Sequence, residues 1–346
     1  MIKRIMLGTA VAMLAAMPVQ AEDFFKGKNI TVVTSTGAGG NYDTIARMVA
    51  RHMSGHLPGK PNMIVQNMPG GGNVRATNFM YNVAAKDGTY IATINNAIPL
   101  AQVLDPRGKR FDARKFNWLG STGNSNSVTI TWHTTGVKTI EDMKKTEVIL
   151  GGTGPASSIV IFPKVMNAVL GTKFKIVIGY KSSSAVDIAL ERGEVRARSG
   201  SYGSIVAKQP DWLSEKKINI LVQVGNKREP SLPNVPLLTE LASNKSERDL
   251  LKLVSAPIAL GRPYLAPPGI PADRLAILRA GFAATVADKG FLAEADKRRV
   301  DIAPMTWQEV SEVVNDTINA PKDVIERAKK VIPKKRKKKK KKKKDS

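Results

Sequence analysis

The sequence predicts an α/β fold of two lobes, each a mostly parallel sheet flanked by helices, with a cleft between the lobes. β-Branched runs alternate with segments of helical periodicity, which is typical of strands joined by crossover helices. A strand, a glycine-rich turn and a helix follow one another from residue 29 to residue 53, and the same order restarts at residue 148. The helical segments after residue 272 have no strands of their own, so we expect them to pack back on the first unit.

The first unit contains three predicted strands and two predicted helices. Its first helix is indicated by Ile45, Met48, Val49 and Met53, which recur at helical spacing. In chain order the predicted elements are a strand at residues 29–34, a helix that ends at Gly55, a strand at 63–66, a helix at 74–82 and a strand at 90–94.

The second unit repeats this alternation and is followed by proline-rich connections. Its predicted elements are a strand at residues 148–150, a helix that ends near Leu170, a strand at 174–178, a short helix at 185–192 and a strand at 218–224. We expect residues 226–236 to form a loop and residues 262–269 to form a rigid connector, because both are rich in proline. Residues 272–287 and 306–315 have the pattern of surface helices.

These elements predict a discontinuous first lobe with a second lobe inserted into it. The first lobe is assigned residues 22–126 and 256–332, and the second is assigned residues 127–255. Two segments then cross between the lobes and form a hinge. The cleft between the lobes is the expected ligand site.

Residues 1–21 have the layout of a cleaved secretory signal peptide. Lys3 and Arg4 form a basic start, residues 5–17 carry no charge, and residues 19–21 form a small-x-small cleavage signature. The alternative is an uncleaved anchor, but a helix needs about 20 apolar residues to span a bilayer, which this run does not supply. We therefore predict a protein that is free in the periplasm. The chain has no Cys, which excludes disulfides, a thiol nucleophile and a cysteine metal site.

Part of the net charge of +25 comes from the C-terminal end. Residues 334–344 are all Lys or Arg, and without this run, Asp345 and the two basic residues of the signal peptide the charge is +13. That charge favours anionic ligands or surfaces through long-range attraction. We predict that residues 333–346 form a disordered poly-lysine tail or result from a reading-frame artefact, with a tether to anionic membranes as an alternative. Nucleic-acid binding is disfavoured, because the tail has no aromatic residue to stack on bases.

Three glycine- or serine-rich turns each follow a predicted strand and precede a predicted helix. They lie at residues 37–41, 69–73 and 151–158. Such a turn exposes backbone N–H groups at the positive end of a helix dipole and can bind an anion without Lys or Arg. Glycine also occurs in such turns for geometry alone. The presence of three turns, in two different lobes, favours the binding interpretation.

Catalytic and nucleotide-binding patterns are absent from the sequence. The turn at residues 37–42 has Tyr42 where a dinucleotide fingerprint needs Gly, and no Gly-Lys-Ser/Thr follows it. His52 and His56 are four residues apart, but Gly55 interrupts their helix and no third metal ligand is evident. No G-x-S-x-G sequence occurs. We therefore predict no catalytic residue, no metal site and no cofactor.

Amide and hydroxyl residues on other loops complete the candidate pocket, because Asn and Ser hydrogen-bond to carboxylates without adding charge. Each could also be a solvated loop tip. Asp43 is ambiguous, since it can support the start of a helix or accept from a ligand hydroxyl or amine. The predicted ligand-binding residues are Gly37, Ala38, Gly39, Gly40, Asn41, Asp43 and Asn95 in the first lobe, and Thr153, Gly154, Ser157, Ser158, Tyr180, Lys181, Ser183, Gly200 and Ser201 in the second.

Five motifs in this order resemble one known family. They are GGNYDTIAR at residues 39–47, VQNMPGGG at 65–72, KDGT at 86–89, LPNVP at 232–236 and LAPPGIP at 265–271. With them the chain, from residue 24 to residue 331, resembles the tripartite tricarboxylate transporter receptors, also called the Bug family of periplasmic binding proteins.

The resemblance implies a Venus-flytrap fold whose lobes close over a small organic acid. It implies that backbone amides of residues 37–41 and 153–158 grip one carboxylate, while residues 180–184 and 200–202 read the rest of the ligand. The implied partners are a large and a small integral membrane subunit driven by an ion gradient. We expect a monomer that is not an enzyme and does not bind nucleic acid.

The chain departs from the family pattern at Ala38, at Asn41 and at residues 181–184, which puts the identity of the acid in doubt. One hypothesis is that Lys181 forms a charge-assisted bond to a second carboxylate, which stabilises by roughly 1.5–3 kcal/mol. Three other functions stay open at this point. They are a sensor of the same fold for a membrane kinase, a periplasmic enzyme that uses the same cleft, and a polyanion-binding protein that acts through the tail.

Overall fold

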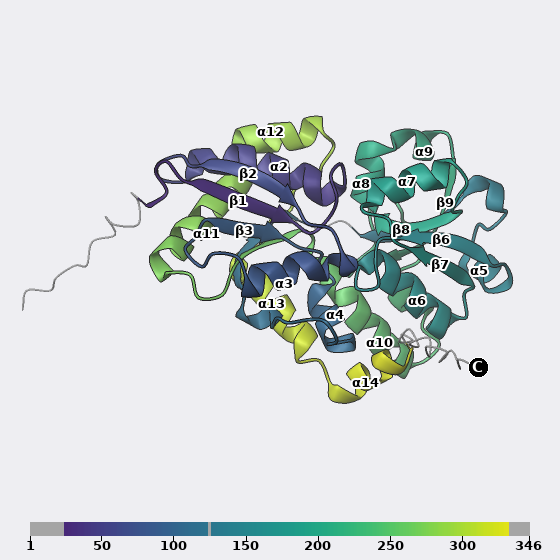
Figure 1. The fold of residues 1–346 in the computed structure, drawn as a ribbon. Coiled ribbons are helices and arrows are strands. Elements are labelled where there is room, and N and C mark those ends of the chain that lie inside the picture. Colours follow the sequence, from purple (N-terminus) through teal and green to yellow (C-terminus); the bar gives the residue numbers. More distant parts are fainter. Residues whose placement is uncertain (1–23, 124–125, 332–346) are drawn as a thin grey trace, which may run out of the picture.

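Two five-stranded sheets, each flanked by helices, form two lobes that lie side by side (Figure 1). The computed structural model describes residues 24–123 and 126–331. The predicted signal peptide and the predicted poly-lysine tail lie outside the described residues. Within them, no helix has both the length and the apolar character that crossing a membrane requires.

The first sheet has the strand order β2-β1-β3-β10-β4. Its strands are β1 (Asn29–Thr34), β2 (Asn62–Asn67), β3 (Tyr90–Thr93), β4 (Asn117–Ser121) and β10 (Pro263–Ala266). β1 pairs in parallel with β2 and β3, whereas β10 is antiparallel to both β3 and β4. Four strands therefore point in one direction and β10 points in the other.

The second sheet has the equivalent order β7-β6-β8-β5-β9. Its strands are β5 (Ser127–Trp132), β6 (Val148–Gly152), β7 (Phe174–Ile178), β8 (Ala197–Ser201) and β9 (Ile218–Val224). Here β5 is the antiparallel strand. In each sheet the antiparallel strand is the first strand that follows a crossing of the chain from the other lobe. The predicted two-lobed fold with mostly parallel sheets is confirmed. The domain boundaries at residues 126 and 255 stay a prediction.

The predicted connector at residues 262–269 is corrected, because it contains strand β10. Its prolines indicated a loop, but Pro263 is the first residue of the strand, where a missing N–H group is tolerated.

The helices, in chain order, are α2 (Asn41–Met53), α3 (Val74–Asn82), α4 (Ile98–Leu104), α5 (Ile140–Lys145), α6 (Ser158–Leu170), α7 (Ser183–Glu191), α8 (Tyr202–Lys208), α9 (Pro210–Ser214), α10 (Lys245–Ser255), α11 (Ala272–Ala287), α12 (Lys289–Lys297), α13 (Trp307–Ile318) and α14 (Lys322–Val331).

The apolar face of α2 shows how the sequence positions the first lobe's helices. Ile45, Met48, Val49 and Met53 are fully buried in a core that also contains residues of β1, α11 and α12. Helical spacing places these four side chains on one stripe, which faces the sheet and α11. Packing of this stripe anchors the N-terminal end of α2 at the carboxyl end of β1.

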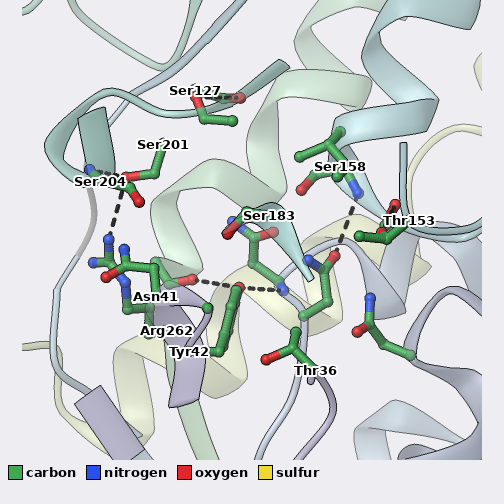
Figure 2. Close-up of a pocket in the computed structure, with 18 of the residues that line it drawn as sticks. Thr36, Asn41, Tyr42, Ser127, Thr153, Ser158, Ser183, Ser201, Ser204 and Arg262 are labelled. Atoms are coloured by element: carbon green, nitrogen blue, oxygen red, sulfur yellow. Dashed lines mark hydrogen bonds between the residues drawn. The ribbon is translucent and has the colours of Figure 1, made fainter. Parts of the chain in front are cut away.

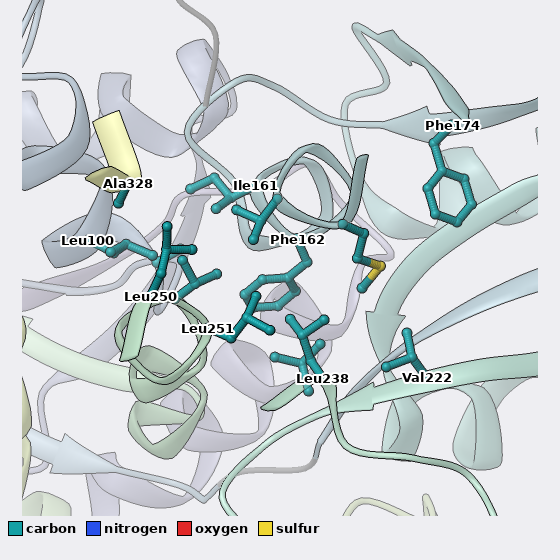
Figure 3. Packing of buried hydrophobic residues seen from close by; sticks show 14 of the residues in the cluster. Leu100, Ile161, Phe162, Phe174, Val222, Leu238, Leu250, Leu251 and Ala328 are labelled. Atoms are coloured by element: carbon teal, nitrogen blue, oxygen red, sulfur yellow. The ribbon is translucent and has the colours of Figure 1, made fainter. Parts of the chain in front are cut away.

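The C-terminal helices divide between two places. As predicted, α11, α12 and α13 pack on the first lobe. α14 instead contacts α10, α4 and α6, so it touches elements of both lobes (Figure 1). Figure 3 shows the result, in which Leu100, Phe162, Leu251 and Ala328 belong to one apolar cluster. This interlobe cluster joins the two lobes on the α4–α6 side of the molecule.

Candidate functional site

A cavity of about 90 Å³ lies between the lobes. The first lobe and the segment before β10 contribute Thr36, Gly40, Asn41, Tyr42, Asn73, Asn95, Asn96, Ile258, Gly261 and Arg262. The second lobe contributes Ser127, Thr153, Ser157, Ser158, Ile159, Ser183, Arg198, Gly200, Ser201 and Ser204 (Figure 2).

Two long helices begin at this cavity, one from each lobe. α2 begins at Asn41 after the turn that follows β1, and α6 begins at Ser158 after the turn that follows β6. Gly39 has a φ of 77°, a left-handed conformation that glycine adopts without strain. Each helix has 13 residues and directs the positive end of its dipole toward the cavity. The cavity is therefore suited to negative charge before any side chain is counted.

Asn95 links the two lobes at the cavity wall. It follows β3, and its side-chain oxygen accepts from the backbone N–H of Ser158 at 3.4 Å and from that of Ala97 at 3.1 Å. On the α6 side, the Thr153 hydroxyl donates to the Ser157 hydroxyl at 2.9 Å. The polar wall is thus held in place by its own hydrogen bonds, and the one between Ser158 and Asn95 crosses between the lobes.

Tyr42 contributes a neutral hydroxyl to the wall. It donates to the carbonyl of Gly261 at 3.2 Å and accepts from the backbone N–H of Asn96 at 3.1 Å (Figure 2). Burial raises the pKa of Tyr42, so the phenol keeps its proton. This hydroxyl connects the N-terminal turn of α2 to the segment before β10.

Arg262 is a buried cation on the cavity wall, with 6% of its surface exposed. Its Nη2 donates to the Ser201 hydroxyl at 3.2 Å and its Nη1 donates to the carbonyl of Gly123 at 3.4 Å. With the Asn41 amide oriented oxygen-inward, that oxygen accepts from Nε at 3.1 Å. Burial lowers the pKa of Arg262. Among the described residues, no carboxylate lies within 4.0 Å of this guanidinium.

Arg198 is the second buried guanidinium of the cavity, with 2% exposed. It forms an ion pair with Asp187 of α7, and its charge is balanced in that way. Its Nη2 has no hydrogen-bond partner in the described part of the chain. The guanidinium lies over Gly200, where an added Cβ would collide with it. Burial lowers the pKa of Arg198 to about 10.

Contacts between the two lobes surround the cavity. The backbone N–H of Gly37 donates to the carbonyl of Lys181 at 3.0 Å. The carbonyl of Gly39 accepts from the Ser184 hydroxyl at 2.9 Å and from Lys208 Nζ at 2.5 Å. Gly72 and Gly154 approach each other so closely that a Cβ on Gly154 would lie 2.5 Å from the backbone nitrogen of Gly72.

Nine of the predicted binding residues line the cavity, and their contact with a ligand stays a prediction. These are Gly40, Asn41, Asn95, Thr153, Ser157, Ser158, Ser183, Gly200 and Ser201. Seven others do not line it, namely Gly37, Ala38, Gly39, Asp43, Gly154, Tyr180 and Lys181. Gly37, Gly39, Gly154 and the backbone of Lys181 instead make the interlobe contacts, and the side chain of Lys181 is exposed.

Asp43 has a role within the first lobe. It accepts from the backbone N–H of Gly39 at 2.9 Å, from Arg47 at 3.1 Å and from Asn67 at 2.8 Å. Burial opposes ionisation, but the hydrogen bonds from Arg47, Asn67 and Gly39 outweigh it and hold the pKa of Asp43 below its usual value. These contacts fix the turn that begins α2.

The arginines Arg198 and Arg262 were not predicted from the sequence. The chain has 54 Lys and Arg residues, and nothing local distinguishes the two that become buried. The neighbours of Arg198 do indicate burial, because it lies between small residues inside β8. In the part of the chain that the structure describes, no group of three or more His, Asp and Glu side chains could hold a metal.

Three comparisons place the chain among known proteins. A curated protein of Cupriavidus necator, named UPF0065 protein in gbd 5'region, is 28% identical over 251 residues, which cover 67% of this chain and 70% of that protein. The periplasmic binding protein BugD is 18% identical, covers 88% of this chain and 97% of its own, and has a TM-score of 0.71. MatC of Rhodopseudomonas palustris with bound malate is 19% identical, covers 88% and 99%, and has a TM-score of 0.68.

The family model of the tripartite tricarboxylate transporter family receptor matches residues 45–329. The family and its structural neighbours are substrate-binding proteins rather than enzymes, which confirms the prediction of a binding protein. The chain therefore belongs to the tripartite tricarboxylate transporter family of receptors.

Proposed function

We propose that this protein captures a small organic carboxylate in the interlobe cavity, in the periplasm, and delivers it to the membrane subunits of a tripartite transporter. The observation that carries the proposal is the meeting of the N-termini of α2 and α6 at one cavity between the lobes. Two helix dipoles directed at one small space favour an anion there. The chain acts as a monomer and needs no cofactor.

The cavity wall supports a carboxylate ligand with polar substituents. Hydroxyl groups of Ser158 and Ser183 can donate to carboxylate oxygens, while the side-chain oxygen of Asn96, which has no partner among the described residues, can accept from a ligand hydroxyl or amine. The bound malate of MatC supports this class of ligand, because malate combines two carboxylates with a hydroxyl. The volume of about 90 Å³ favours a short acid.

A thermal-shift screen of the chain without residues 1–21 tests the proposal. The panel contains mono-, di- and tricarboxylic acids, amino acids and aromatic acids. An acid at one hundred times its Kd adds about 2.7 kcal/mol to the free energy of unfolding, so the midpoint temperature of thermal unfolding rises clearly. We expect a short hydroxy- or dicarboxylic acid to give the largest rise.

A ligand that co-purifies with the protein would hide this shift. Mass spectrometry of the small molecules released on denaturation identifies such a ligand. If no acid raises the midpoint and no acid is released, the carboxylate receptor function is wrong. Uptake of the identified acid by cells that lack this chain then tests delivery to a transporter, because uptake should fall to background.

A further inference from the structure

We propose that Arg262 makes closure of the two lobes depend on an anion in the cavity. The inference rests on the proposed receptor function and adds to it a reason why the ligand must carry negative charge. Three features of Arg262 support it, namely its position between the two lobes, the contacts of its guanidinium with both lobes, and the neutral character of the groups that accept its hydrogen bonds.

Arg262 lies where the two connections between the lobes meet. One connection joins β4 to β5 and includes Gly123, and the other joins β9 to β10 and ends at Arg262. The backbone N–H of Arg262 donates to the carbonyl of Gly123 at 3.2 Å, and its carbonyl accepts from Thr122 at 3.4 Å. The two crossover segments are therefore hydrogen-bonded to each other at this residue, which places it on the hinge.

The guanidinium of Arg262 reaches from this hinge to both lobes. It contacts the Asn41 amide at the start of α2 in the first lobe and the Ser201 hydroxyl at the end of β8 in the second (Figure 2). Opening the lobes would pull these two contacts apart. The side chain therefore senses the lobe arrangement directly.

The acceptors of Arg262 are neutral, although its charge is buried. They are an amide oxygen, a hydroxyl and a backbone carbonyl, and no carboxylate lies within 4.0 Å in the described part of the chain. A buried charge is costly when it has no counter-charge. Arg198, the other buried guanidinium of the cavity, has Asp187 as its partner. Asp301 acts on Arg262 only from beyond 4.0 Å, so Arg262 is the buried guanidinium of the cavity that has no adjacent carboxylate among the described residues.

A ligand carboxylate supplies the missing counter-charge when the lobes close over it. Without an anion, closure would leave the guanidinium shielded from water and uncompensated, so the open, hydrated arrangement is favoured. An anion binds the closed state better than the open state, and that difference shifts the population toward closure. A neutral analogue of the same shape would not produce this shift.

Interlobe distance measurements on the chain without residues 1–21 test this anion-dependent closure, which we call the gate. Because the chain contains no Cys, two label positions can be introduced cleanly, Lys289→Cys at α12 and Ser214→Cys at α9. Both residues are exposed and they lie on different lobes. Spin labels at these positions report the closed fraction by pulsed electron resonance, after bound small molecules have been removed by denaturation, dialysis and refolding.

Two variants remove the unbalanced positive charge by different routes. Asn41→Asp puts a carboxylate beside the guanidinium at the start of a helix, where a carboxylate is favoured. Arg262→Met removes the charge at similar volume. We expect both variants to be mainly closed without any ligand, whereas the unchanged chain is mainly open and closes with malate. Affinity for malate should fall roughly 10- to 100-fold in both variants. Arg262→Lys keeps the charge and should retain ligand-dependent closure.

Matched controls make the same chemical changes away from the cavity. Asn315→Asp on α13 and Arg228→Met in the exposed part of the β9–β10 connection should behave like the unchanged chain. The gate is overturned if ligand-free Asn41→Asp is as open as the unchanged chain, or if the unchanged chain is already closed without ligand. Asn41→Asp decides the question if Arg262→Met does not fold. A failure of all acids to bind would instead contradict the receptor function, while the ligand-free comparison still tests the gate.

Discussion

At the scale of single residues, the position of Lys181 changes what is expected of it. The sequence suggested that its charge could reach a second carboxylate, but its side chain is exposed and does not line the cavity. Its backbone carbonyl carries the contact to Gly37. We therefore expect Lys181→Ala to change affinity for the identified acid by less than about twofold, since exposed charges contribute little. Isothermal titration calorimetry measures this, and a tenfold loss would restore the original hypothesis.

The buried ion pair of Arg198 and Asp187 leads to a second prediction. Both side chains are at most 5% exposed, so removing one leaves the other as an uncompensated buried charge. Arg198→Met should lower the free energy of unfolding by about 3–5 kcal/mol. The double variant Arg198→Met with Asp187→Leu should recover most of this loss. Urea denaturation measures both, and an equal loss in the single and double variants would contradict the explanation.

At the scale of elements, the turns before α3 and α6 touch across the cleft. Gly72 and Gly154 leave no room there for a Cβ, although Gly154 itself has no left-handed φ. Gly154→Ala should therefore fold normally but close poorly, because its collision with Gly72 exists only in the closed state. We expect affinity for the identified acid to fall more than about tenfold, by the loss of closure contacts.

Gly55→Ala is the matched control, since a Cβ at Gly55 meets nothing within 4 Å. Its affinity should equal that of the unchanged chain. Thermal unfolding without ligand should be similar for both alanine variants. If Gly154→Ala binds as tightly as Gly55→Ala, the two turns do not meet in the liganded protein.

The contact between α2 and α12 depends on the ionisation of Glu294. Burial opposes its ionisation, but hydrogen bonds from Arg51, His52 and Arg298 prevail and lower the pKa of Glu294 to about 2. A carboxylate with a lowered folded-state pKa stabilises above its unfolded pKa of about 4.3, and this contribution is lost as the pH falls toward 2. Glu294→Gln should flatten the pH dependence of stability in this window, measured by urea denaturation from pH 2 to 6. An unchanged slope would contradict this assignment.

At the scale of the whole molecule, the interlobe cluster connects the two lobes. Leu251 of α10 is fully buried in it, beside residues of α4, α6 and α14 (Figure 3). We expect the lobes to unfold together, in one calorimetric transition, because separate unfolding would expose this cluster. Leu251→Ala should lower that single midpoint, at a cost of about 2–5 kcal/mol. Two separate transitions in the unchanged chain would show that the cluster does not couple the lobes.

Much of the fold can be predicted from local pattern. Period-two and helical spacing identify elements such as β1 and α3, whose predicted bounds agree with the structure. Glycine-rich turns identify where helices begin beside strands. Strand β10 was missed because the proline at its start and the two prolines after its end are typical of a loop, and its pairing with β3 and β4 depends on residues more than 140 positions away. Local pattern does not contain that pairing.

The sequence by itself determined the α/β class, the two units, the turns that begin α2 and α6 and the family, because each depends on neighbouring residues or on motifs in order. Only the tertiary structure decided which turn residues line the cavity and which, such as Gly37 and Gly154, bring the lobes together. It also decided that Arg198 and Arg262 are buried, and that no carboxylate of the described residues lies within 4.0 Å of Arg262. The physical reason is that burial and charge compensation depend on groups brought together from distant parts of the chain.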